Sequence, residues 1–155
     1  MSKTSANSSD IRTRFKLDLS FFPAWLITFI STYAISYVWH GILLNDLTRI
    51  AYPKDLFLLM VAVVYFVISF VITFLIKVMT SPDKGVLRGI WIGGSVGAFI
   101  YLIAFVFGIS FYANPSLEHI LLDACWQVVE QSFGAIVAAS VLTLATSMSK
   151  VKTLD

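Results

Sequence analysis

The chain has 155 residues, of which 58% are hydrophobic and 13% are charged, with a formal net charge of +2. Soluble domains are about 25% charged, and a small water-soluble chain has too much surface for its volume to hide so many apolar side chains. The composition excludes a soluble enzyme, a disordered chain and a nucleic-acid-binding protein. It predicts an integral membrane protein whose first partner is the lipid bilayer.

Residues 1–18 are polar and basic, and we expect them to form a disordered cytoplasmic tail. The apolar segment that follows, residues 19–44, is far longer than the roughly 7–15 apolar residues of a cleavable signal peptide. We therefore interpret it as a retained first span. Trp25 and Trp39 lie about 21 Å apart along it, a spacing that suits two interfacial aromatic belts.

Four segments reach the roughly 20 apolar residues that a membrane-spanning helix needs. They are residues 19–44, 56–79, 87–112 and 117–147, and Pro, Asn, Asp and Lys residues separate them. Backbone groups cannot remain unpaired in lipid, so these segments are predicted to be helices. The sequence thus predicts an all-α, four-helix transmembrane bundle over residues 19–147, followed by a cytoplasmic tail, residues 148–155.

The Lys and Arg residues are distributed unevenly about these spans. Nine of the 11 lie on one side: in the N-terminal tail, in the C-terminal tail, and in or next to the connection between spans two and three, at Lys77, Lys84 and Arg88. Only Arg49 and Lys54 belong to the opposite side. Because cytoplasmic segments carry the excess of Lys and Arg, both termini are predicted to be cytoplasmic, in the inner membrane of a bacterium.

The third span has a glycine at every fourth position, at Gly89, Gly93 and Gly97. Residues four apart lie on one helix face, and glycines there form a flat groove that another helix backbone can approach closely. The groove is interpreted as a packing surface, within the bundle or in a dimer. A surface facing a pore or ligand is the alternative.

The fourth span carries polar side chains on one face of an otherwise apolar helix. They are His119, Asp123, Trp126, Gln127 and Glu130. Polar groups within a membrane normally face the bundle interior or a water-filled cavity. This face is either a buried network that fixes helix packing or a functional pocket, in which Glu130 exchanges protons with a substrate pathway.

The first span carries a matching stripe, Thr32, Ser36 and His40, again at every fourth position. With both termini cytoplasmic, His40 reaches the outer level of His119 and Asp123, and Asp46 follows shortly after. We predict a polar seam between the first and fourth helices, with a pH-sensitive hydrogen-bond cluster at its outer end. A metal site is the alternative there. The spacing matches no known metal site, and no cofactor motif is present, so neither a metal nor a cofactor is predicted.

Three features resemble a bacterial membrane family. They are Trp39-His40-Gly41, the glycine-rich third span and the segment 122–126, Leu-Asp-Ala-Cys-Trp. In these features the chain resembles the family called Domain of Unknown Function 1761, which implies four spans and a membrane location. The resemblance covers about residues 22–145. Gln127 and Glu130 are outside the matching pattern.

Two functional hypotheses remain open. The chain is either a small oligomeric transporter or channel, with Asp123 and Glu130 as proton- or cation-linked groups, or a non-catalytic accessory or scaffold subunit of a larger membrane complex. The corresponding partners are copies of the same chain or a larger membrane protein. An enzyme is not predicted, because no nucleophile–base pair and no catalytic residue can be identified.

Overall fold

The computed structural model describes residues 19–48, 53–79, 85–108 and 116–152. The elements in chain order are α2 (Phe21–Ser36), the π-helix η1 (Tyr37–Leu43), the 3-10 helix η2 (Asp46–Thr48), α3 (Lys54–Met79), α4 (Gly85–Val106) and α5 (Leu117–Lys152). Four of the described stretches are long and apolar enough to cross a membrane: Phe21–Leu43, Lys54–Met79, Val86–Val106 and Leu117–Met148. The prediction of an all-helical chain is confirmed for the described residues, and four of its helices are long and apolar enough to span a membrane. The predicted N-terminal tail, residues 1–18, and residues 109–112 of the third predicted span lie outside them.

Local sequence explains several helix ends. Asn45 adopts a positive φ of 53° directly after the first span, a conformation that Asn tolerates better than most residues. Gly108 does the same after α4, with φ of 66°, as is common at helix C-termini. At the start of α5, the Ser116 hydroxyl accepts a hydrogen bond from the His119 backbone N–H, at 3.3 Å. In return, the Ser116 backbone N–H donates to Nδ1 of His119, at 3.3 Å.

The last helix is longer than its apolar segment. We predicted a span ending at 147 and a tail over residues 148–155, whereas α5 continues to Lys152. Residues 148–152 include neither Gly nor Pro, so nothing in the local sequence terminates the helix where its apolar character ends.

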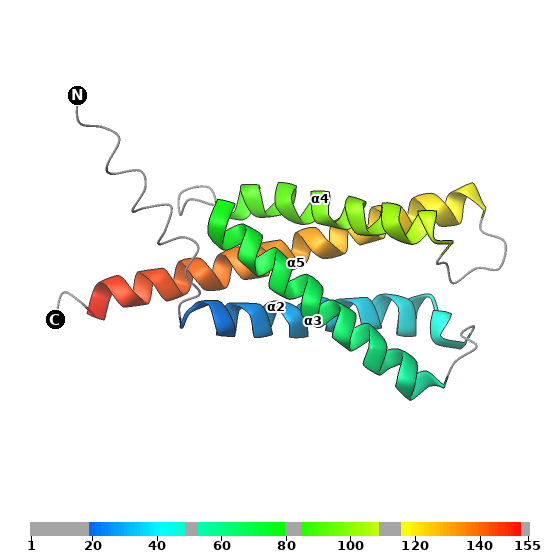
Figure 1. The fold of residues 1–155 in the computed structure, drawn as a ribbon, viewed down its shortest axis with the longest axis horizontal. Coiled ribbons are helices and arrows are strands. Elements are labelled where there is room, and N and C mark those ends of the chain that lie inside the picture. The colour runs from blue at the N-terminus through cyan, green and yellow to red at the C-terminus, as the bar shows by residue number, and fades with distance from the viewer. Residues whose placement is uncertain (1–18, 49–52, 80–84, 109–115, 153–155) are drawn as a thin grey trace, which may run out of the picture.

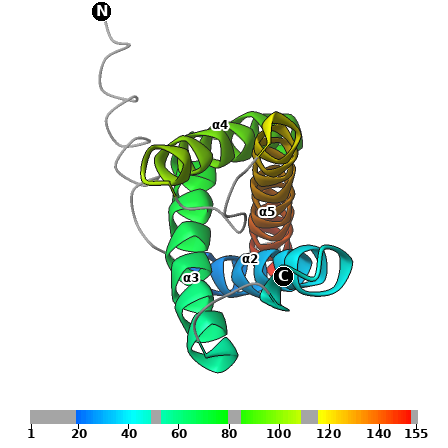
Figure 2. The same ribbon diagram turned by 90° about the vertical axis from the view of Figure 1, so that its right-hand side faces the viewer.

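Helix α5 runs through the length of the bundle and packs against the other three helices, most extensively against α4. Seen end-on, the four helices surround a shared interior, and α3 forms one side of it, inclined to the other three helices (Figures 1 and 2). The bundle has two ends. At the Phe21 end, α2 begins and α3 and α5 finish, and at the Asn45 end, the first span finishes and α3 and α5 begin.

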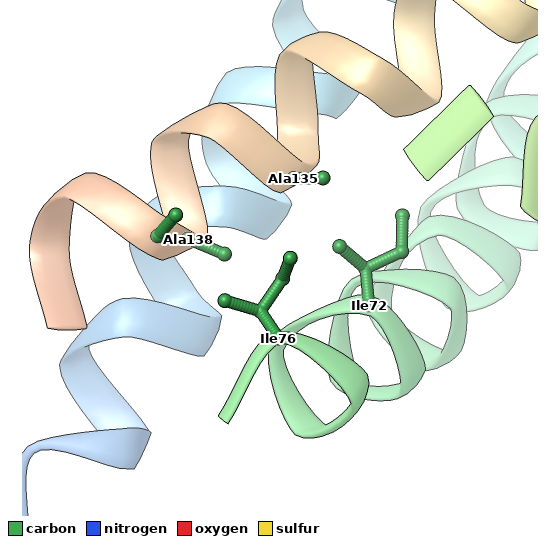
Figure 3. Packing of buried hydrophobic residues seen from close by; sticks show 5 residues of the cluster. Ile72, Ile76, Ala135 and Ala138 are labelled. Carbon is green, nitrogen blue, oxygen red and sulfur yellow. The ribbon is translucent and has the colours of Figure 1, made fainter. Parts of the chain in front are cut away.

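The interior toward the Phe21 end is apolar. Ile72 and Ile76 of α3 pack against three small side chains of α5, those of Ala135, Ala138 and Ala139 (Figure 3). These five side chains are at most 2% exposed. Small residues allow the α3 and α5 backbones to approach closely, so these two helices are held together here by tight apolar packing.

The middle of the bundle is polar instead. Eight polar side chains are buried in the described residues, and seven of them come from α2, α3 and α5. These seven are Thr28, Thr32, Ser36, Ser69, Thr73, Glu130 and Gln131. Polar groups are costly inside a membrane and usually mark a functional region, so this layer positions the candidate site.

Candidate functional site

Glu130 lies at the centre of the buried polar layer and is 0% exposed. Its Oε1 accepts hydrogen bonds from the Tyr65 hydroxyl of α3 and from Nε2 of Gln131, the latter at 3.0 Å. Its Oε2 accepts one from Nε1 of Trp126, at 2.9 Å. Tyr65 is 11 residues after the start of α3 and 14 before its end, so the carboxyl group lies near mid-depth in the bundle.

Hydroxyl groups extend this network to α2. The Ser36 and Tyr65 hydroxyl oxygens are 2.7 Å apart. Because the single Tyr65 proton goes to Glu130, Ser36 is the donor in this pair. One turn further toward the Phe21 end, Thr32 and Ser69 form a second bridge between α2 and α3, with hydroxyl oxygens 3.2 Å apart. Three helices thus contribute to the polar layer, through a network centred on Glu130 and a separate Thr32–Ser69 bridge.

Two stacked indole rings lie beside Glu130. The rings of Trp39 and Trp126 have centroids 4.0 Å apart and an interplanar angle of 8°. Trp39 belongs to η1, a seven-residue π-helix, and π-helical turns occur often at functional sites. Since Trp126 also donates to Glu130, the carboxyl group is linked through one side chain to the irregular end of the first span.

A second set of ionisable groups lies nearer the Asn45 end. Nδ1 of His40 is 2.9 Å from Oδ2 of Asp46, whose side chain is 1% exposed. Asp123 of α5 is within electrostatic range of His40, Asp46 and His119. Glu130 is also within range of His40. His40 therefore lies between the buried carboxyl group and the acids at the Asn45 end.

The remaining residues of the predicted seam have different surroundings. His119 takes part in the reciprocal hydrogen bonds with Ser116 at the start of α5. Gln127 is half-buried, and its main chain packs against Gly97 of α4. The structure brings Ser36, Trp126 and Glu130 into one network through Tyr65. Thr32 belongs to the neighbouring bridge with Ser69, and Gln127 lies on the α4 side of α5.

The predicted glycine groove of α4 lies against α5. A Cβ atom at Gly93 or Gly97 would collide with the main chain of Gln131 or Gln127, respectively. At Gly89 it would lie 3.2 Å from the carbonyl oxygen of Ala135. The three glycines therefore pack within the chain, against the face of α5 that contains Gln127, Gln131 and Ala135.

Sequence reasoning missed the contribution of α3. Tyr65, Ser69 and Thr73 are all buried and repeat at every fourth position of a strongly apolar helix. That spacing places them on one face, and it was a usable signal for a third polar stripe. Gln131 was also missed, although it directly follows Glu130.

Among the residues that the structure describes, no group of three or more His, Cys, Asp or Glu side chains could hold a metal ion. Comparisons with protein-family models, with curated proteins and with solved structures find no match for this chain. The chemistry of the site therefore follows from its own residues. They supply a buried carboxyl group, hydroxyl groups from the surrounding helices, and ionisable side chains toward the Asn45 end.

Proposed function

We propose that this chain is a small oligomeric transporter or channel in which Glu130 is the proton- or cation-linked group. One observation carries the proposal: a fully buried carboxyl group lies near mid-depth, surrounded by polar side chains from three membrane-spanning helices. Buried ionisable groups at that depth typically mark ion pathways and proton relays. The resemblance to Domain of Unknown Function 1761 stays a prediction and adds no activity.

The distribution of polar and apolar side chains in the interior supports an ion path from the Asn45 end of the bundle. Between Glu130 and the Asn45 end lie three ionisable side chains, those of His40, Asp46 and Asp123. Between Glu130 and the Phe21 end lies the apolar packing of Ile76, Ala138 and their neighbours. Such a site is reached from the Asn45 end and closed at the other, as expected for one state of an alternating-access cycle.

We further propose that both termini are cytoplasmic, which places the Asn45 end outside the inner membrane. The support is the excess of Lys and Arg in the two terminal tails and in the connection between α3 and α4. In this orientation, Glu130 takes up protons or cations from the extracytoplasmic side.

Reconstitution into liposomes tests the transport proposal. An imposed proton or Na⁺ gradient is followed with an internal pH-sensitive dye and with a radioactive Na⁺ tracer. Wild-type protein is expected to dissipate at least one gradient, and Glu130→Gln is expected to reduce the rate to that of empty liposomes. Glu118→Gln is the matched control, because Glu118 is an exposed acid of the same helix. Equal rates for wild type and empty liposomes, or for wild type and Glu130→Gln, would overturn the proposal.

One observation favours the accessory subunit as a second candidate. The α4 face directed away from α5 carries large exposed side chains, with Trp91 73% and Phe99 64% exposed. In such a complex, a larger membrane protein would cover these side chains, which would otherwise contact lipid. Purification in mild detergent separates the candidates: an accessory subunit yields a stoichiometric partner, and a transporter yields this chain alone or as a homo-oligomer.

A further inference from the structure

The Glu130 carboxyl group is surrounded by hydrogen-bond donors. In the part of the chain that the structure describes, these donors are the hydroxyl of Tyr65, Nε1 of Trp126 and Nε2 of Gln131. Indole and amide N–H groups only donate, whereas a hydroxyl group can donate or accept. A metal cation needs oxygen lone pairs directed at it, and these neighbours direct hydrogen atoms at the carboxyl group instead. The surroundings of Glu130 therefore suit a carboxylate that takes up a proton.

A protonated Glu130 needs an acceptor for its new O–H group. The two N–H donors cannot accept. The Tyr65 oxygen can accept once Tyr65 turns its own proton toward Ser36, whose hydroxyl oxygen is 2.7 Å away. Ser36 then turns its proton to the carbonyl oxygen one turn earlier in its helix, as Thr32 already does at 2.8 Å. Ser36, Tyr65 and Glu130 thus stay hydrogen-bonded in both protonation states of the acid.

We propose that Ser36 and Tyr65 form a proton relay to Glu130, which makes a proton the coupled ion. This inference rests on the proposed function and deepens it. Before transfer, Ser36 donates to Tyr65, and Tyr65 donates to the Glu130 carboxylate. A proton that reaches Oγ of Ser36 moves the Ser36 proton to the Tyr65 oxygen, and Tyr65 passes its own proton to Oε1 of Glu130. Each hydroxyl oxygen gains one proton and loses one, so both stay neutral and only Glu130 changes charge.

The relay begins on the side from which we propose that ions enter. Ser36 is the last residue of α2, and His40 of η1 lies four residues further toward the Asn45 end. Residues four apart share a helix face, and His40 is within electrostatic range of Glu130. Asp46 and Asp123 lie near His40, and acids raise the local concentration of cations, protons included. Because imidazole groups commonly serve as proton shuttles, His40 is well placed to deliver a proton to Ser36.

The Gln131 amide offers a rival partner for a protonated Glu130. Its Oε1 is buried and makes no hydrogen bond within the described helices. Rotation of the amide would turn this oxygen toward the acid and would accept its proton without any change at Tyr65. The two arrangements differ in one measurable respect, because only the relay makes the rate of proton arrival depend on the Tyr65 hydroxyl.

The test follows protonation of Glu130 in the full chain in detergent, which needs no transport. A light-triggered acid lowers the pH, and time-resolved infrared spectroscopy records the C=O band of the carboxylic acid that forms. Glu130→Gln assigns the band by removing it. Tyr65→Phe, which keeps the ring and removes the hydroxyl, is expected to slow the appearance of the band by about a hundredfold and to leave its final amplitude unchanged. Ser36→Ala is expected to have the same effect and provides the measurement if Tyr65→Phe does not fold.

Tyr33→Phe is the matched control. Tyr33 lies beside Tyr65, with ring centroids 6.2 Å apart, but its hydroxyl donates to the carbonyl oxygen of Leu58, at 3.3 Å. Removal of this hydroxyl is expected to leave the rate of Glu130 protonation as it is in the wild type.

Three results would overturn the relay: no Glu130 band on acidification, a wild-type rate in both Tyr65→Phe and Ser36→Ala, or slow protonation in Gln131→Met alone. The outcome is separable from that of the transport proposal. Protonation that depends on Tyr65, without flux in liposomes, retains the relay and rejects the transporter. Flux in the wild type, together with fast protonation in Tyr65→Phe, retains the transporter and rejects the relay.

Discussion

The indole N–H of Trp126 donates a 2.9 Å hydrogen bond to Glu130, which lies one turn further along the same helix. The same indole ring stacks on Trp39 of η1. One side chain therefore stabilises the buried carboxyl group and contacts the π-helical end of the first span.

Replacing Trp126 with Phe removes the donor but retains an aromatic ring opposite Trp39. A hydrogen bond to a charged group contributes about 1.5–3 kcal/mol, so we expect Trp126→Phe to lower the free energy of unfolding by about 2 kcal/mol. Thermal unfolding in mild detergent measures the change. Trp91→Phe is the control, since Trp91 is 73% exposed, and its expected effect is within about 0.5 kcal/mol.

A double-mutant cycle separates this hydrogen bond from the loss of ring volume. In a Glu130→Gln background, Trp126→Phe loses the smaller bond to a neutral acceptor, and we expect its cost to fall by about 1 kcal/mol. If Trp126→Phe costs the same in both backgrounds, the indole stabilises the protein through packing alone and the proposed link to Glu130 is wrong.

The close contact between α4 and α5 gives a prediction with a neighbouring control. A Cβ atom at Gly93 would meet the main chain of Gln131, whereas one at Gly94 would meet the Ser132 hydroxyl at 3.3 Å and the Val128 side chain at 3.5 Å. A main chain cannot move aside as a side chain can. We expect Gly93→Ala to destabilise the protein by about 1–3 kcal/mol and Gly94→Ala by less than about 0.5 kcal/mol.

Size-exclusion chromatography after graded heating measures this difference. If Gly93→Ala is as stable as Gly94→Ala, α4 does not pack on α5 as closely as the structure shows. The groove would then face another chain or a ligand, the alternative that its sequence pattern left open.

The proposed orientation is tested by cysteine labelling in intact cells. In a Cys125→Ser background, which removes the exposed native thiol, Asn45→Cys is expected to react with a membrane-impermeant maleimide. Ser149→Cys, at the far end of α5, is expected to react only after the membrane is permeabilised. The opposite pattern would place both termini outside and would mean that the Lys and Arg distribution does not determine the topology of this chain.

The sequence was sufficient to predict the four spans, because apolar length is a direct consequence of membrane thickness. It did not reveal which way individual side chains face. Trp25 and Trp39 suited two interfacial belts by spacing, yet Nε1 of Trp25 donates to the carbonyl oxygen of Phe66, and Trp39 stacks on Trp126 with a buried Nε1. A tryptophan near a helix end has the same sequence pattern whether its side chain faces the membrane interface or the bundle interior. The packing between helices determines which way the side chain points.

The candidate site could likewise be predicted only in part. Thr32, Ser36 and Glu130 could be proposed from polar residues that repeat on one face of an apolar helix. Tyr65, Ser69 and Thr73 have the same repeat but were overlooked because hydroxyl groups reduce the hydropathy of α3 very little. The π-helix could not be predicted, since residues 37–43 contain no local signal that distinguishes π-helical from α-helical hydrogen bonding.

The pair formed by His40 and Asp46 leads to the last prediction. Asp46 is 1% exposed and its Oδ2 lies 2.9 Å from Nδ1 of His40, across the turn in which Asn45 has a positive φ. Asp46→Asn keeps the shape and removes the charge. A hydrogen bond to a charged group contributes about 1.5–3 kcal/mol, so we expect a decrease in melting temperature, together with slower uptake in liposomes. Asp55→Asn, at an exposed acid of the first turn of α3, is expected to change both little. If the two variants behave alike, the His40–Asp46 pair neither stabilises the end of η1 nor attracts cations toward Glu130. The proposed ion path from the Asn45 end would then not include these two residues.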